Sequence, residues 1–224
     1  MAGWRTLLER LATGLEELER NGTPVPRWTM GGGTALMLVA KHRLSRDIDA
    51  FIDSPDFLTY LSPRLGGESV WNCSAYQEGH NFLKLRFPEG EIDFIAAGDI
   101  TRLAAETVEI GYDADATTPS TKIRVEHPVE IALKKLFYRG RSILVRDAFD
   151  ICVVDRLQPE LLRSNLRFVS ERKTEIETAA GRLVPDFIRM SLEELDVLPG
   201  WEDVAARTHD RFLEIVSDIP EASR

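Results

Sequence analysis

The chain has 224 residues, of which 43% are hydrophobic and 29% are charged. This composition is globular, which excludes disordered and fibrous classes, and a chain of this length can bury about 70% of its unfolded surface without disulfide or metal staples. The net charge of −9 argues against indiscriminate binding to polyanions, because affinity for nucleic acid depends largely on phosphates neutralised by Lys and Arg.

The N-terminal residues 1–20 combine leucines with many charged side chains and contain no continuous apolar run. They match neither a signal peptide nor a membrane span. The two cysteines, Cys73 and Cys152, form no CxxC motif, and the histidines lack the spacing of zinc ligands. We therefore expect a cytoplasmic protein with reduced thiols and no membrane contact.

Helical patterns open the chain. Leucines recur at helical spacing over residues 5–20, and Asn21-Gly22 is typical of a C-cap, so this segment is predicted to be an amphipathic helix. Three glycines at 31–33 precede a second predicted helix over 34–42, which is rich in Ala, Leu and Met.

Strand patterns dominate the next part of the chain, with one helix predicted over 55–65. Pro88-Glu89-Gly90 is a turn that joins two of the strands. The predicted strands are 47–52 (DIDAFI), 71–77 (WNCSAYQ), 81–87 (NFLKLRF) and 91–97 (EIDFIAA). Together they predict a mixed sheet of about four strands with helices packed on it.

Strand signals stop after KIRVEH at 122–127. Pro128 suits the first turn of a helix, and helical patterns then continue to the end of the chain. The predicted helices are 128–139, a segment after Gly140 that ends near 157, and 159–180, 185–195 and 201–217. The sequence therefore predicts an α+β protein with a mixed-sheet domain over 1–125 and a C-terminal helical bundle over 126–224.

Charge is unevenly distributed along the chain. Residues 122–146 contain seven basic and two acidic side chains, a balance that suits phosphate binding. Residues 193–224 contain nine acidic and three basic side chains, which is typical of a solvated helical surface and less often of a docking face for a basic partner.

The glycines ahead of the second helix are the first candidate binding element. Glycines at a helix start let the backbone approach a ligand, and the N–H groups and helix dipole there favour an anion such as phosphate. Thr34 adds a hydroxyl at the same place. The same pattern also serves as a plain turn and cap, so alone it is weak evidence.

Three aspartates in the predicted strands are candidate metal ligands. Residues two apart on a strand point to one side, so Asp47 and Asp49 share a face while Ile48 faces the core. Asp93 has the same setting in a neighbouring predicted strand. Carboxylates gathered in this way bind hard cations such as Mg²⁺, and three of them suggest two ions. The alternative is that the first two only form ion pairs with the arginines just before them.

The spacing of these motifs resembles that of a known superfamily. Gly33-Thr34, twelve further residues and then Asp-Ile-Asp are arranged like the signature of the polymerase-β-like nucleotidyltransferases. The stretches GGTAL, HRLSRDIDAF and KKLFYRGRSILVRDAFDI together look like the AbiEii/AbiGii family, the toxin halves of toxin–antitoxin and phage-exclusion pairs. The resemblance covers roughly residues 29–156, and no motif matches after about residue 160.

The resemblance implies that a first group of residues holds the triphosphate of a nucleotide, namely Gly32, Gly33 and Thr34. It implies that a second group binds Mg²⁺, namely Asp47, Asp49 and Asp93. The last of these would also help to deprotonate the attacking group.

The family's later motifs match one of two adjacent lysines and one of two aspartates. We prefer Lys135 to Lys134, as the residue that neutralises phosphate charge, and Asp147 to Asp150, as the residue that orients this lysine or a ligand. One of the two lysines is expected on a solvated helix face, and Asp150 is expected to pair with Arg146 one turn earlier.

The implied activity is that of a Mg²⁺-dependent nucleotidyltransferase, which transfers NMP from an NTP to an acceptor hydroxyl and releases pyrophosphate. The family implies the 3′ end of a tRNA as acceptor, received by the basic residues 122–146, with growth arrest as the outcome and a cognate antitoxin as partner. The alternatives are a small-molecule adenylyltransferase of the antibiotic-modifying type and a non-catalytic module that binds a nucleotide or docks an antitoxin.

Overall fold

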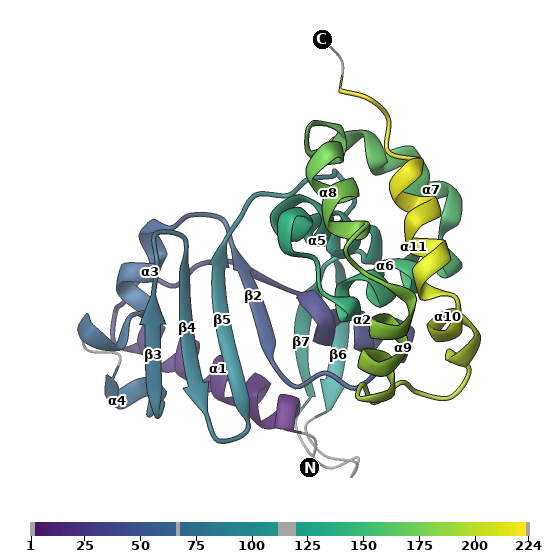
Figure 1. Ribbon diagram of the computed structural model, residues 1–224. Helices are drawn as coiled ribbons and strands as arrows, with labels where there is room; N and C mark the ends of the chain where they lie inside the picture. Colours follow the sequence, from purple (N-terminus) through teal and green to yellow (C-terminus); the bar gives the residue numbers. More distant parts are fainter. Residues whose placement is uncertain (1–2, 66–67, 112–119, 223–224) are drawn as a thin grey trace. The chain divides into compact units, whose positions relative to one another are not determined.

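The described part of the chain, residues 3–65, 68–111 and 120–222 of a computed structural model, contains a mixed sheet and a set of helices (Figure 1). It divides into two units that interleave along the sequence. The first, the sheet unit, comprises Met1–Ala35, Ser45–Gly98 and Ala105–Glu126. The second, the helical unit, comprises Leu36–Leu44, Asp99–Ala104 and His127–Arg224.

The sheet has seven strands in the order β3-β4-β5-β2-β1-β7-β6. β2 runs parallel to β5 and β1 runs parallel to β7, while the other neighbouring pairs are antiparallel. The strands are β1 (Trp28–Gly31), β2 (Ile48–Ile52), β3 (Ala75–Glu78), β4 (Phe82–Phe87), β5 (Gly90–Ala96), β6 (Glu106–Gly111) and β7 (Ser120–Val125). The mixed sheet is confirmed.

The predicted count of about four strands was too low. β1 has four residues and runs directly into the glycines, and β6 is mostly exposed, so neither strand carries a clear burial pattern. The strand predicted over 71–77 begins later, because Trp71 ends the short helix α4 (Glu68–Trp71) and only Ala75–Glu78 pairs with β4. Short strands are specified mainly by their neighbours, which explains these errors.

One face of the sheet is apolar and packs against helix α1 (Gly3–Arg20). Alternation in β2 buries Ile48, Ala50 and Ile52, and alternation in β4 and β5 buries their apolar residues in the same way. Gly14 of α1 has no side chain, and a Cβ there would overlap the ring of Trp71. This packing fixes the strand register, so the polar residues between the apolar ones all face the other way.

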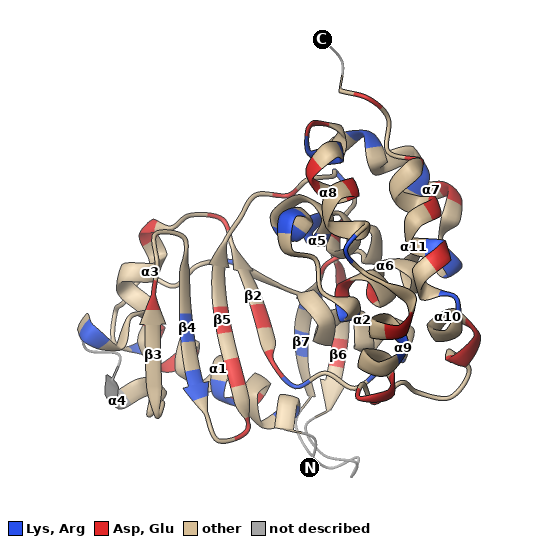
Figure 2. Cartoon of the chain, in the orientation of Figure 1, with Lys and Arg blue, Asp and Glu red and all other residues tan. Residues whose placement is uncertain are grey.

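The opposite face carries the charges. Figure 2 shows acidic positions on β2 and β5 next to basic positions on β4. The remaining helices of the sheet unit are α3 (Asp56–Leu61), followed by the 3-10 turn η1 (Pro63–Leu65), and α4. Helix α2 (Gly32–Ala40) begins in the sheet unit and ends in the helical unit.

The helical unit is built from the helices expected after Pro128. They are α5 (Pro128–Arg139), α6 (Val145–Leu157), α7 (Pro159–Asn165), α8 (Lys173–Ala180), α9 (Pro185–Glu193), α10 (Glu202–Ala206) and α11 (Thr208–Ser217), with 3-10 segments η2 (Gly140–Ser142) and η3 (Leu166–Arg172). Pro128 stands in the first turn of α5, and the His127 side chain accepts a hydrogen bond from the Val129 N–H. No described helix combines the length and apolar character needed to cross a membrane.

Candidate functional site

The glycines join β1 to α2 through a turn that only glycine fits. Gly32 has a φ of +67°, and a Cβ at this position would overlap the carboxylate of Asp49. In the sheet register Gly31 lies directly opposite Asp49. The start of α2 and the middle of β2 therefore meet at one point, with no side chain between the backbone and the carboxylate.

Thr34 connects the same helix start to the segment before β2. Its hydroxyl donates to the Asp47 carbonyl oxygen at 2.5 Å and lies 2.9 Å from the Ser45 hydroxyl oxygen. The side chain is completely buried. In this structure Thr34 thus holds the backbone beside Asp47, and its expected contact with a triphosphate stays a prediction.

Charged residues form a row across the sheet. Asp49 on β2 is the register partner of Asp93 on β5, and Asp93 is the register partner of Lys84 on β4. Partners in adjacent strands project to the same face, so these side chains stand next to one another. Figure 2 shows red positions on β2 and β5 and blue positions on the neighbouring β4. The structure therefore brings Asp49 and Asp93 together beside the Gly32 turn.

Asp47 belongs to the same face but uses one oxygen within the protein. It precedes β2, and its Oδ1 accepts a hydrogen bond from the Glu91 backbone N–H at 3.0 Å. A Cβ on Gly90 would come within 3.0 Å of the same oxygen. The carboxylate is consequently anchored to the start of β5.

Asp93 lies in a strongly perturbed environment. Burial raises its pKa to about 6; the ion pair with Lys84 opposes this shift, and the charges of Asp49 and Glu91 add to it. Its Oδ2 binds the Lys84 ammonium at 2.7 Å. Its Oδ1 is buried and makes no hydrogen bond to any described residue. A carboxylate in this state gains from an additional cation or proton at Oδ1.

The donor set fits a divalent cation. The described residues contain no group of three or more His, Cys, Asp or Glu side chains already arranged around a metal position. Two adjacent carboxylates, one with an unsatisfied buried oxygen, are nevertheless what Mg²⁺ commonly takes from a protein when phosphate oxygens supply other ligands. Asp49 and Asp93 would hold such an ion, and Asp47 lies on the same face.

Sequence reasoning missed two residues of this face. Lys84 and Glu91 form an ion pair of 2.5 Å, and Glu91 also pairs with Arg86 at 3.1 Å. The signal was present, because the alternation in NFLKLRF places Lys84 and Arg86 opposite the buried leucines. It could not show that β4 pairs with β5 in the register that puts Lys84 against Asp93.

The later motif residues lie in the helical unit and form a buried ion-pair cluster there. Lys135 on α5 binds Asp147 at 2.6 Å and Asp150 at 2.9 Å, both on α6. Asp150 also accepts hydrogen bonds from Arg43 at 2.7 and 2.8 Å and contacts the His42 ring nitrogen at 2.8 Å. The pKa of Asp150 is well below its usual value, because Lys135 and Arg43 outweigh complete burial.

Two expectations about this cluster were wrong. Asp150 is fully buried among Lys135, Arg43 and His42, whereas a pair with Arg146 was expected. Neither lysine lies on a solvated helix face, since Lys134 and Lys135 are only 4% and 8% exposed. Lys134 pairs with Glu130 one turn earlier on α5 and with Asp99, whereas the partners of Lys135 come from α6. Helical spacing within α5 reveals only the pair with Glu130.

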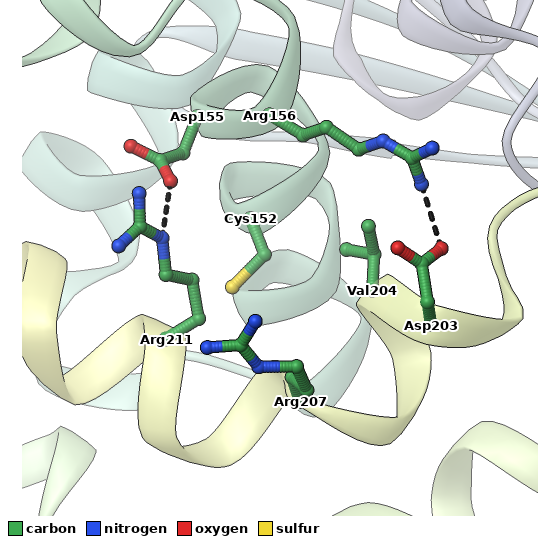
Figure 3. A pocket seen from close by; sticks show the side chains of 7 residues that line it. All are labelled: Cys152, Asp155, Arg156, Asp203, Val204, Arg207 and Arg211. Atoms are coloured by element: carbon green, nitrogen blue, oxygen red, sulfur yellow. Dashed lines mark hydrogen bonds and ion pairs between the residues drawn. The ribbon is translucent and has the colours of Figure 1, made fainter.

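The helical unit also contains a pocket of about 340 Å³ (Figure 3). Its lining residues are Cys152, Asp155, Arg156, Asp203, Val204, Arg207 and Arg211. Two of its arginines are engaged with its aspartates, Arg211 with Asp155 at 2.5 Å and Arg156 with Asp203 at 2.7 Å. Burial raises the pKa of the Cys152 thiol above its usual value, which disfavours the thiolate form.

Comparison with known proteins points to one family. The family model described as "Nucleotidyl transferase AbiEii toxin, Type IV TA system" matches residues 18–221. A crystal structure of a candidate nucleotidyltransferase from H. pylori is similar with a TM-score of 0.46 and 13% identity, and covers 94% of this chain and 93% of its own. We draw no conclusion from a likeness of this degree. The curated proteins contain no match to the sequence.

Proposed function

The chain belongs to the AbiEii family of nucleotidyl transferase toxins, and from this membership we propose that it transfers a nucleotide from an NTP to an acceptor hydroxyl with the help of Mg²⁺. Its class is therefore nucleotidyltransferase, and it is the toxin component of a toxin–antitoxin system. The observation that carries the proposal is the pair Asp49 and Asp93, in register on β2 and β5 beside the Gly32 turn.

Each candidate site residue of the sheet unit has a role in this proposal that follows from its position. The side chain-free turn at Gly32 and Gly33 lets phosphate oxygens approach the backbone N–H groups at the start of α2. Asp49 and Asp93 hold the divalent cation, with Asp47 beside them. A bound divalent cation neutralises phosphate charge and polarises the attacked phosphoryl group.

Asp93 also suits proton transfer. With a pKa of about 6, raised first by burial, its carboxylate is mostly ionised at neutral pH and is a moderately strong base. Its Oδ1 has no competing hydrogen bond from the described residues. It is therefore the group proposed to take the proton of the attacking hydroxyl.

Lys135 and Asp147 remain predicted contributors from the helical unit. Their ion pair, with Asp150 as a second partner, holds the lysine in one conformation. Burial alone would raise the pKa of Asp147, but Lys135 and Arg139 outweigh it and lower the pKa. The Lys135 ammonium group held in this way is the group that we propose to neutralise phosphate charge.

We propose a tRNA 3′ end as the acceptor, in line with the family resemblance, and a cognate antitoxin as partner. Of the basic residues in 122–146, Lys134 and Lys135 are buried and paired, so they are not surface contacts for RNA. The exposed ones, which would contact phosphates, are Lys122, Arg124, Arg139, Arg141 and Arg146. Such contacts position an RNA without specifying its sequence.

The test is to incubate the purified chain with each α-labelled NTP, Mg²⁺ and total tRNA, and to express it in a bacterium. We expect label in tRNA and arrest of growth. Asp49→Asn should abolish both while the far-UV circular dichroism spectrum is retained. Asp53→Asn, an exposed aspartate just after β2, is the matched control and should behave as the wild type.

Other outcomes would redirect or remove the proposal. Label in an added small molecule rather than in RNA would identify an adenylyltransferase of the antibiotic-modifying type. No label with any NTP would support a non-catalytic module. Growth arrest that survives Asp49→Asn would show that the toxicity does not depend on this site.

A further inference from the structure

Lys84 on β4 contacts two acidic side chains on the charged face of the sheet, those of Asp93 and Glu91. Its Nζ lies 2.7 Å from Asp93 Oδ2 and 2.5 Å from Glu91 Oε2, so one ammonium group bridges two carboxylates. The side chain is 24% exposed, and Asp93 is 19% exposed. An ion pair that is shielded from water to this extent is screened less by salt than a surface pair is.

The bridge places an ammonium group at the carboxylate that the proposed function assigns to the metal. Lys84 Nζ contacts one oxygen of Asp93 and one oxygen of Glu91, so a cation bound at Asp93 would lie close to this ammonium group.

We propose that Lys84 is a built-in counter-ion of the acidic site, which competes with the divalent cation for Asp93 and keeps metal binding weak in the absence of a nucleotide. This role rests on the proposed function, since it assumes that Asp49 and Asp93 take the cation. A cation at this carboxylate shares it with an ammonium group, and the two positive charges repel each other. A triphosphate offers the ammonium other negative partners and removes this competition.

Arg86 provides an internal comparison. It is the next residue on the same face of β4 and pairs with Glu91 at 3.1 Å, but its side chain is 52% exposed and no ion pair with Asp93 is present among the described residues. The competing charge is therefore specific to Lys84. A neutral substitution of Arg86 removes the same charge from the same strand without freeing Asp93.

The experiment measures Mn²⁺ binding to the purified full-length chain without nucleotide, by electron paramagnetic resonance at pH 8. Lys84→Gln removes the charge and keeps an N–H donor on a slightly shorter side chain. We expect it to bind Mn²⁺ about tenfold more tightly, the scale of repulsion between a divalent and a monovalent cation a few ångströms apart in a high effective dielectric. Lys84→Arg should match the wild type, and Arg86→Gln should change the affinity less than twofold, that is by under about 0.4 kcal/mol.

Adding a nucleotide gives a second test of the counter-ion role of Lys84. A non-reactive NTP analogue should tighten Mn²⁺ binding more in the wild type than in Lys84→Gln, because the competition that the nucleotide relieves is already absent in the variant. The rise in Tm on adding Mn²⁺ should be larger in Lys84→Gln than in the wild type, and Lys84→Met should show the same rise if the glutamine variant does not fold.

Failure of this role can be told from failure of the proposed site. If Asp49→Asn weakens Mn²⁺ binding but Lys84→Gln binds no more tightly than the wild type, only the counter-ion role is overturned. If Asp49→Asn does not change the affinity for Mn²⁺, or if neither the wild type nor Lys84→Gln binds Mn²⁺, the metal site and the counter-ion role are both overturned.

Discussion

The pKa of Asp93 makes the stability of the protein depend on pH. This carboxyl titrates near 6 when folded, raised first by burial, and near its ordinary 3.8 when unfolded. The folded state therefore holds the proton more tightly, and its contribution to stability is complete below about pH 4 and is lost as the pH rises through 6. We expect the free energy of unfolding in urea, without metal, to include a term that falls by about 1 kcal/mol between pH 5 and pH 8.

Asp93→Asn removes this titration. The unfolding free energy of the variant should then lack the fall of about 1 kcal/mol between pH 5 and pH 8 that Asp93 causes in the wild type. An identical pH dependence in both proteins would mean that Asp93 is not protonated preferentially in the folded state, and would also weaken its assignment as the base.

Gly32 lets the backbone lie closer to the Asp49 carboxylate than any residue with a side chain would allow. A side chain there must adopt a φ of +67° and displace the Asp49 carboxylate. Gly22 has a similar φ of +80° with nothing within 4 Å of a Cβ, so Gly22→Ala measures the backbone cost alone, about 1–2 kcal/mol. Gly32→Ala should cost more in urea unfolding and should also lower Mn²⁺ affinity, whereas Gly22→Ala leaves that affinity unchanged.

Equal effects of the two substitutions would show that the turn and Asp49 are not in contact. The comparison works because both glycines have positive φ and only one faces a carboxylate. Its result decides whether the three glycines form a binding element or only a turn, the alternative that the sequence left open.

At the scale of elements, the periodicity of apolar residues was sufficient to predict a helix or strand wherever that element buries one face. α1 and α5 match their predicted ranges within two residues, and so do β2, β4 and β5, since apolar residues recur with period 3.6 or 2 along them. β1 was missed because it has only four residues, and β6 was missed because it is mostly exposed and lacks an apolar alternation.

The residues of the candidate site also divide into those that alternation along a strand predicts and those that it does not. Asp47, Asp49 and Asp93 were found because alternation alone places them on the polar face of their strands. Lys84 was missed, since strand order and register are needed to set β4 beside β5. Asp150 was assigned a wrong partner because the residue that binds it, Arg43, comes from a segment over a hundred positions earlier.

Asp150 connects three elements of the helical unit, namely α5 through Lys135, α6 and the segment containing His42 and Arg43. Asp150→Asn removes the buried negative charge that Lys135 and Arg43 both contact. We expect a loss of about 3–5 kcal/mol in urea unfolding, which is typical when one partner of a buried ion pair is removed.

The matched control is Asp203→Asn, which breaks the ion pair with Arg156 in the same unit. Asp203 is 69% exposed, so its loss should cost no more than about 1 kcal/mol. If the two variants lose equal stability, burial does not make the Asp150 cluster more important than an ordinary surface pair.

At the scale of the whole molecule, the two units are interleaved rather than consecutive. Leu36–Leu44 and Asp99–Ala104 lie within the N-terminal half of the sequence but belong to the helical unit. The second of these segments is held by Glu130 on α5, which accepts hydrogen bonds from the Ile100 and Thr101 backbone N–H groups at 2.7 Å. The single boundary near residue 125 stays a prediction.

This interleaving predicts how the protein responds to division at that boundary. A fragment of residues 127–224 retains Asp150 and Glu130 but lacks their partners from the N-terminal half, so buried carboxylates lose their donors. We expect the fragment alone to show no cooperative thermal transition by circular dichroism, and to regain one when fragment 1–126, which supplies both missing segments, is added. A fragment that unfolds cooperatively by itself at the Tm of the full chain would show that these contacts contribute little, and that the C-terminal helices form an autonomous domain.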